Sequence, residues 1–151
     1  MTAHIIDGLL DCIMLVDDNE STNFYNSIVI QKAGLHVHVQ EVINGMDALN
    51  YLMGKGSFSG HTSPLPQPGI IFLDINMPGM DGWEFLQEYQ NLPADRRQRI
   101  AVHILTTSSN PDDIKKADEN EYVEGFISKP LNPRHVLDIV NIHWPHMSRR
   151  Q

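Results

Sequence analysis

Residues 69–82, with the sequence GIIFLDINMPGMDG, constrain the fold more than any other part of the chain. The apolar run 70–73 contains two β-branched residues and ends abruptly in Asp74, which is typical of a buried strand in a parallel sheet. The proline and glycines of residues 78–82 disfavour both strand and helix, so a shaped loop is expected next. Asp74 is therefore predicted at the carboxyl end of a buried strand, the edge where open α/β sheets bind ligands.

Four other short apolar runs are also typical of strands, and helical patterns separate them. The five expected strands span residues 12–16, 35–39, 70–73, 100–105 and 125–128. Side chains that favour helix N-caps precede the helical patterns, at Asn19, Asn44, Asp81, Asn110 and Asn132. Five strands that alternate with five helices predict an α/β fold, a doubly wound five-stranded parallel sheet covered on both faces.

Composition restricts the classes of protein to which this chain can belong. With 151 residues, 41% of them hydrophobic, it has the size and apolar content of one domain. The net charge of −8 argues against a nucleic-acid partner, because such binding depends mainly on Lys and Arg. The single cysteine, Cys12, excludes an internal disulfide and is expected to be a buried structural thiol.

We expect residues 11–143 to form the domain, with an N-terminal arm at 1–10 and a basic C-terminal tail at 144–151. No signal peptide is evident, and no apolar run approaches the roughly 20 residues that span a bilayer. A cytoplasmic protein without a membrane contact is therefore expected. Residues 54–69 are rich in Gly, Ser and Pro and predict a loop insertion. That loop is either functional or mobile, or it is a surface insertion without consequence.

Polar residues stand directly after four of the five predicted strands. Asp17 and Asp18 follow the first strand, Asp74 the third, Thr106 the fourth and Lys129 the fifth. The carboxyl ends of parallel strands share one edge of a sheet, so we expect these side chains to meet there. Three carboxylates at one edge repel one another without a cation, and Mg²⁺ prefers oxygen ligands of this kind. The lysine and the hydroxyl fit a transferring phosphoryl group, with a carboxylate as nucleophile.

These residues lie in motifs that resemble the receiver domain of response regulators, over residues 11–143. The motifs are Val16-Asp17-Asp18, Leu73-Asp74, the loop 77–82, Leu105-Thr106 and Lys129-Pro130. The resemblance implies the flavodoxin-like (βα)5 receiver fold and two-component signalling, not the turnover chemistry of an enzyme. Asp74 would accept a phosphoryl group from a sensor histidine kinase or a phosphotransfer protein. The chain would then signal through a conformational change at its last helices and last strand.

The same resemblance implies how a Mg²⁺ ion would be held. Asp18 and Asp74 would bind it through their carboxylates, Asn76 through its backbone carbonyl and Asp17 through a water molecule.

Further roles follow from the resemblance for the phosphoryl group and the switch. Lys129 would pair with the phosphoryl oxygens, and Thr106 would move to hydrogen-bond them while Phe126 turns inward behind it. Phe126 stands where Tyr is frequent, so a switch that needs a hydroxyl at this position is excluded. Thr107 stands where a smaller residue is usual, and its bulk is expected to narrow access to the phosphoryl group.

The Thr-Thr-Ser run at 106–108 and the long loop before the central strand resemble stand-alone regulators that serve phytochrome-type sensor kinases. A homodimer and an unidentified downstream protein are the other partners that this resemblance raises.

The sequence disfavours three alternative classes of protein or site. An aspartyl-phosphate phosphohydrolase needs an acid/base two residues after the nucleophile, where Asn76 stands and cannot serve. A flavodoxin-like cofactor binder would place an anionic flavin phosphate against three carboxylates. A zinc site at His36 and His38, or at His143 and His146, lacks a cysteine or third clustered ligand, so scattered imidazoles are favoured.

Overall fold

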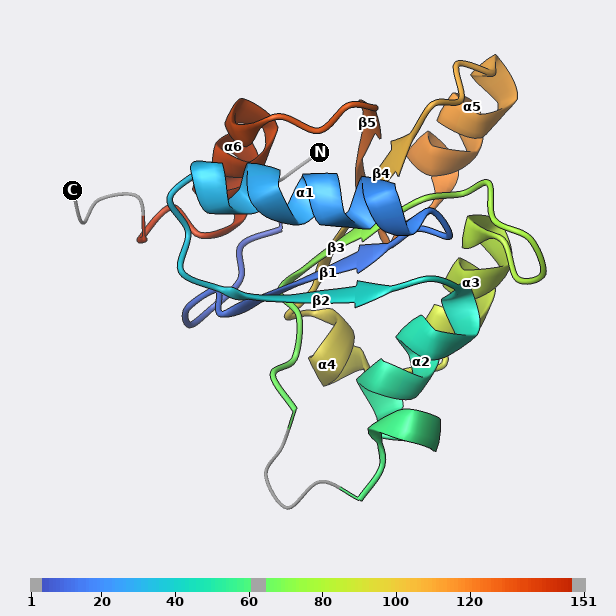
Figure 1. Cartoon of the computed structure of the whole chain (residues 1–151), viewed down its shortest axis with the longest axis horizontal. Helices are drawn as coiled ribbons and strands as arrows, with labels where there is room; N and C mark the ends of the chain where they lie inside the picture. Colours follow the sequence, from blue (N-terminus) through green and yellow to red (C-terminus); the bar gives the residue numbers. More distant parts are fainter. Residues whose placement is uncertain (1–3, 61–64, 148–151) are drawn as a thin grey trace.

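The computed structural model describes residues 4–60 and 65–147, in which strands and helices alternate along the chain (Figure 1). The strands are β1 (Cys12–Val16), β2 (His38–Val42), β3 (Ile70–Leu73), β4 (Ala101–Thr106) and β5 (Val123–Ser128). The helices are α1 (Glu20–Lys32), α2 (Gly45–Met53), α3 (Gly82–Tyr89), α4 (Ala94–Arg97), α5 (Pro111–Glu119) and α6 (Pro133–His143). A single 3₁₀ turn, η1 (Gly56–Phe58), follows α2.

The five strands form one parallel sheet in the order β2-β1-β3-β4-β5. Helices α1 and α6 cover one face, and α2, α3 and α4 lie on the other (Figure 1). Along β1 the side chains alternate between the two cores: Ile13 packs with the α1 and α6 residues, and Met14 with those of α2 and α3. The prediction of a doubly wound parallel α/β fold is therefore confirmed.

Cys12 is fully buried at the start of β1, as expected. Burial raises the pKa of its thiol to about 12, so the reactive thiolate does not form at neutral pH. None of the helices in residues 4–60 and 65–147 is long and apolar enough to cross a membrane.

β4 and β5 begin and end within two residues of the predicted strands, and two other elements differ more from the sequence prediction. The second strand was expected at 35–39 but lies at His38–Val42, because it pairs in register with β1 from His38 opposite Cys12. This strand is at the sheet edge and only Val42 is fully buried, so its apolar pattern specifies its position weakly. Five helices were predicted, but the connection from α3 to β4 contains a further one-turn helix, α4. The Arg96 guanidinium of α4 donates a hydrogen bond to the Leu52 carbonyl at the end of α2.

The described parts of the 54–69 loop are attached to the core. The Tyr51 hydroxyl donates a 2.6 Å hydrogen bond to the Pro66 carbonyl, and Phe58 and Leu65 pack against the cluster beneath α2 and α3. Residues 61–64 of this loop lie outside the described part of the chain.

The N-terminal arm packs against α6 and the residues that follow it. Ile6 and Leu10 are buried with Trp144 in the same core, and the Ile6 amide donates a 2.9 Å hydrogen bond to the His143 carbonyl. The His143 Nδ1 in turn donates to the carbonyl of His4, whose ring lies 2.8 Å from a Glu124 carboxylate oxygen on β5. The arm thus connects α6 to the edge strand β5. Arg149 and Arg150 of the expected basic tail lie outside the described residues.

Three of the four histidines named for a zinc site, His38, His143 and His146, have other partners. His38 contacts the Gln40 side chain, His146 donates to the Gly8 carbonyl, and the Nε2 atoms of His143 and His103 lie 3.2 Å apart. Among the described residues, the group of His, Cys, Asp or Glu side chains that could hold a metal ion lies elsewhere, at the strand-end carboxylates.

Candidate functional site

The three strand-end carboxylates lie together at the carboxyl edge of the sheet. Asp17 and Asp18 follow β1, and Asp74 follows β3, which is the neighbour of β1 in the sheet. Each of the three carboxylates offers one oxygen within 4.8 Å of the other two. Asp17 and Asp74 are buried, whereas Asp18 is exposed. The site is thus an acidic pocket with two sunken carboxylates and one at its mouth.

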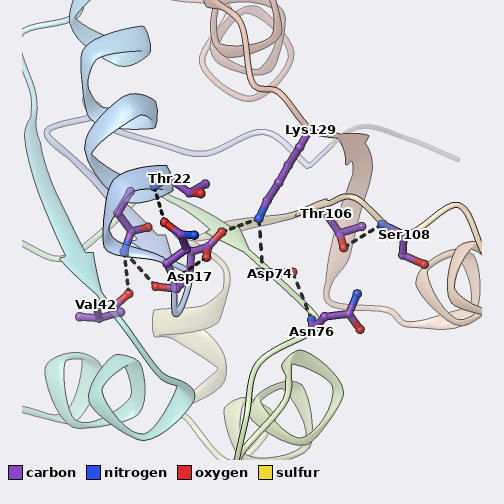
Figure 2. A network of polar contacts seen from close by, with 10 residues as sticks. Asp17, Thr22, Val42, Asp74, Asn76, Thr106, Ser108 and Lys129 are labelled. Atoms are coloured by element: carbon purple, nitrogen blue, oxygen red, sulfur yellow. Dashed lines mark hydrogen bonds and ion pairs between the residues drawn. The ribbon is translucent and has the colours of Figure 1, made fainter.

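Lys129 brings a positive charge to this pocket from the end of β5. Its Nζ lies 2.6 Å from Asp17 Oδ2 and 3.5 Å from Asp74 Oδ2. Figure 2 shows the long side chain of Lys129 reaching down to the two carboxylates. One ammonium against three carboxylates leaves a surplus of negative charge, which a divalent cation would neutralise.

The Asp74 carboxyl group is held by contacts on both oxygens. Asp74 Oδ1 accepts a 3.1 Å hydrogen bond from the backbone N–H of Asn76, while Oδ2 faces Lys129. Burial raises the pKa of this carboxyl, and the Asn76 hydrogen bond and the Lys129 charge act against that rise. A carboxylate oxygen kept basic by its burial, and oriented by these two groups, is suited to act as a nucleophile.

The loop after Asp74 needs its glycines. Gly79 has a φ of +75°, in the left-handed region that favours glycine. A Cβ atom at Gly82 would lie 2.7 Å from Ile75 Cα and 2.8 Å from the Asp74 carbonyl oxygen. The backbone therefore folds back on itself next to Asp74. Asp81, the predicted N-cap, forms a capping box with Glu84 that starts α3.

Thr106 ends β4 with its side chain fully buried beside the acidic pocket (Figure 2). Its Oγ1 accepts a 3.2 Å hydrogen bond from the Ser108 amide, and the Ser108 hydroxyl donates a 2.6 Å bond to Asp113 on α5. Asp113 also accepts a 3.4 Å bond from the Trp83 indole on α3. This chain of contacts connects the end of β4 to two helices, and the strand-end pattern alone did not predict the part beyond Ser108.

The two other residues expected in the switch are Thr107, which follows Thr106 directly, and Phe126, which lies opposite Ile104 on the neighbouring strand β5. Thr107 is exposed, and Phe126 is half-buried on β5 against the small core of Ile75, Ile104 and Ala117. Asn76 has an exposed side chain and stands two residues after Asp74, to which its backbone N–H donates a hydrogen bond. The structure thus brings Asp17, Asp18, Asp74 and Lys129 into one pocket, with Thr106 beside it.

Sequence reasoning missed one buried residue behind this pocket, Asn23 of α1. Its side-chain amide donates hydrogen bonds to the backbone carbonyls of Asp17 and Val42, at 3.0 and 3.1 Å. A polar residue in the first turns of an amphipathic helix has no sequence signal that separates it from a solvated one.

Comparison with known proteins agrees with this architecture. The family model "Response regulator receiver domain" matches residues 13–141. The response regulator Rcp1 of Synechocystis sp. is 29% identical over 85% of this chain and 82% of its own length. The bacteriophytochrome response regulator AtBRR is similar in structure, with a TM-score of 0.73, 28% identity and coverage of 91% of this chain and 96% of that one.

Two further solved structures extend the comparison. A two-component response regulator from Cytophaga hutchinsonii has a TM-score of 0.73 and 29% identity over 89% of this chain and 96% of its own. The phosphorylated cyanobacterial phytochrome response regulator RcpA has a TM-score of 0.63 and 33% identity over 87% of this chain and 89% of its own. The family match spans nearly the whole described domain and covers β2 to β5 completely and β1 from its second residue. The chain therefore belongs to the response regulator receiver domain family.

Proposed function

We propose that this chain is a cytoplasmic response regulator of a two-component phosphorelay that is phosphorylated on Asp74. The observation that carries the proposal is the position of the Asp74 carboxylate, buried beside Lys129 and within 4.8 Å of two further carboxylates. The donor is a sensor histidine kinase or a phosphotransfer protein. Because two of the similar solved structures, AtBRR and RcpA, are phytochrome response regulators, we propose a phytochrome-type kinase as the donor.

The pocket fits a Mg²⁺ ion by the chemistry of its donors. All three clustered side chains are carboxylates, and the exposed position of Asp18 leaves room for the waters that Mg²⁺ retains. In our proposal Asp18 and Asp74 bind the ion directly, the Asn76 carbonyl adds a third ligand and Asp17 acts through water. A bound Mg²⁺ supplies positive charge that neutralises the phosphoryl oxygens during transfer.

The residues of the chain account for the transfer step. An Asp74 oxygen forms a bond to phosphorus as the phosphorus–nitrogen bond of a phosphohistidine breaks, and the bonding electrons leave with the histidine nitrogen. The Lys129 ammonium then exchanges its contact with Asp74 for one with the phosphoryl oxygens. Thr106 moves to donate its hydroxyl hydrogen to the same oxygens, and Phe126 fills the space behind it.

The result is a signalling module rather than a turnover enzyme, since its chemistry acts on its own side chain. The change at Thr106 and Phe126 would alter the surface built by residues 111–143, which would bind a downstream protein or a second copy of this chain. Sedimentation velocity before and after phosphorylation tests the homodimer. We expect a shift from monomer to dimer on phosphorylation, and a monomer in both states would contradict it.

Intact-mass measurement tests the proposed function directly. The protein is incubated with phosphoramidate, with Mg²⁺ or with a chelator, and the Asp74→Asn variant is treated in parallel. We expect the mass of one phosphoryl group to be gained only with Mg²⁺ and only by the parent protein. Gain by Asp74→Asn to the same extent would assign the phosphoryl group to another residue and overturn the proposal.

Thr107→Ala is expected to shorten the lifetime of the phosphoryl group by several-fold. Thr107 is exposed directly after the end of β4, so in our proposal its side chain restricts the approach of water to phosphorylated Asp74. The measurement is the decay of the phosphorylated mass after the donor is removed. The control is Thr22→Ala, which removes the same hydroxyl and methyl on α1 and should leave the decay unchanged. Equal lifetimes for Thr107→Ala and the parent would exclude this role.

A further inference from the structure

Asp18 differs from the other two acids of the pocket in how it is held. Asp17 and Asp74 each contact Lys129 and each accept a backbone hydrogen bond, from Asn19 and Asn76 respectively. In residues 4–60 and 65–147 the Asp18 carboxylate makes no hydrogen bond or ion pair, although it lies within 4.8 Å of both like charges. Repulsion favours its departure from the pocket. Its position must therefore come from the backbone on either side of it.

Both peptide groups that flank Asp18 are held by side chains. The peptide group after Asp18 is fixed because the backbone N–H of Asn19 donates a 2.9 Å hydrogen bond to Asp17 Oδ1. The peptide before it is fixed because the Asp17 carbonyl accepts a 3.0 Å hydrogen bond from Asn23 Nδ2. With these two planes set, the direction of the Asp18 Cα–Cβ bond is also set.

Asn23 connects this loop to the neighbouring strand. The same Nδ2 donates a 3.1 Å bond to the Val42 carbonyl at the end of β2, which also accepts a 3.2 Å bond from the Asp17 amide. The side chain is 1% exposed, so these contacts are shielded from water. One buried amide thus ties the end of β1, the end of β2 and the first turns of α1 together.

The carbonyl oxygen of the Asn23 side chain indicates that stability alone does not explain an asparagine at this position. Its Oδ1 is buried and has no hydrogen-bond partner among the residues that the structure describes. A buried acceptor without a partner destabilises the fold, so the two hydrogen bonds from Nδ2 are made at a cost in stability. Such local conflicts are expected where function sets the residue.

We propose that Asn23 is a positioning residue that preorganises Asp18 for the divalent cation of the pocket. This inference rests on the proposed function. Without Asn23, the Asp17 carbonyl loses its partner, the loop relaxes away from the other carboxylates, and the cation must order it again on binding. The loss of Asn23 therefore weakens the affinity for the cation and leaves the phosphorylation chemistry of Asp74 unchanged.

The test is the Mg²⁺ dissociation constant of the unphosphorylated protein, measured by isothermal titration calorimetry. We expect Asn23→Ala to raise it about 10- to 100-fold, the range found when a supporting hydrogen bond behind a metal ligand is lost. At saturating Mg²⁺ its phosphorylation by phosphoramidate should return close to the parent rate. The control is Val29→Ala, a buried position further along α1, which lowers stability but should leave the constant within twofold.

Two results would overturn the inference: an unchanged constant in Asn23→Ala, or an equal rise in Val29→Ala. If circular dichroism shows that Asn23→Ala does not fold, Asn23→Ser, which keeps a short donor, takes its place with a smaller expected rise, and an unchanged constant there overturns it too. A parent protein that binds no Mg²⁺ would instead overturn the proposed function itself.

Discussion

Lys129→Met is expected to slow phosphorylation of Asp74 by about 10²- to 10³-fold, the usual effect of removing one group that stabilises transferring charge. Lys129 is the cation that reaches both Asp17 and Asp74, at 2.6 and 3.5 Å, so its loss leaves the phosphoryl oxygens without that partner. The same substitution should tighten Mg²⁺ binding several-fold, because the pocket loses a positive charge that competes with the ion. Slower transfer with tighter Mg²⁺ binding is a combination that misfolding does not produce.

The rate is followed by intact mass with phosphoramidate at saturating Mg²⁺, and the affinity by calorimetry. Lys115→Met is the matched control, because it removes the same charge from an exposed position on α5. Its rate and affinity should equal those of the parent. A Lys129→Met protein that is phosphorylated at the parent rate would show that the ammonium takes no part in transfer.

His103→Gln is expected to make the fold less sensitive to acid. His103 is buried on β4 with its Nε2 3.2 Å from that of His143, and burial, with a smaller contribution from His143, lowers the pKa of His103 to about 3. In the unfolded chain a histidine titrates near pH 6.5. Because the folded pKa is the lower one, this group's contribution to stability is complete above about pH 6.5 and is lost as the pH falls toward 3.

The expected loss from His103 is about 1.4 kcal/mol per pH unit, or about 2 kcal/mol between pH 6.5 and 5. Glutamine keeps a donor for His143 but does not titrate, so His103→Gln should lose about 2 kcal/mol less than the parent over this interval. Urea unfolding at pH 7 and at pH 5 measures the difference. His36→Gln, at an exposed position without a hydrogen-bond partner in the described chain, should behave as the parent does. Equal acid sensitivity of His103→Gln and the parent would contradict the prediction.

The parts of the fold that the sequence predicted are those with a strong local pattern. The central strand of residues 70–73 is an unbroken apolar run because both of its faces are buried, and helix starts such as Asp81 and Asn110 are fixed by contacts within three residues. The same reasoning placed the strand-end acids and Lys129 at one edge, since parallel strands must end together. The predicted position of the edge strand β2 was wrong and the single turn α4 was missed, because neither segment has a clear repeat of buried apolar residues.

The remaining features depend on tertiary contacts between distant segments. The Asn23 side chain meets the Val42 carbonyl because β2 lies beside β1, and Ser108 meets Asp113 because α5 turns back toward the end of β4. No local signal distinguishes these polar residues from solvated ones. The arm of residues 4–11 has no clear period, yet Ile6 and Leu10 are buried because α6 and Trp144 provide their partners.

That arm also sets an order of events in the synthesis and folding of the chain. The hydrogen bond between His143 and the His4 carbonyl joins residues 139 positions apart, so it forms only when α6 has been made. Domains are synthesised from the N-terminus, and a contact across such a long loop carries a closure entropy that short-range contacts avoid. The packing of Ile6 and Leu10 against Trp144 therefore forms only after every strand of the sheet has been synthesised. Residues made early are among the last to reach their native packing.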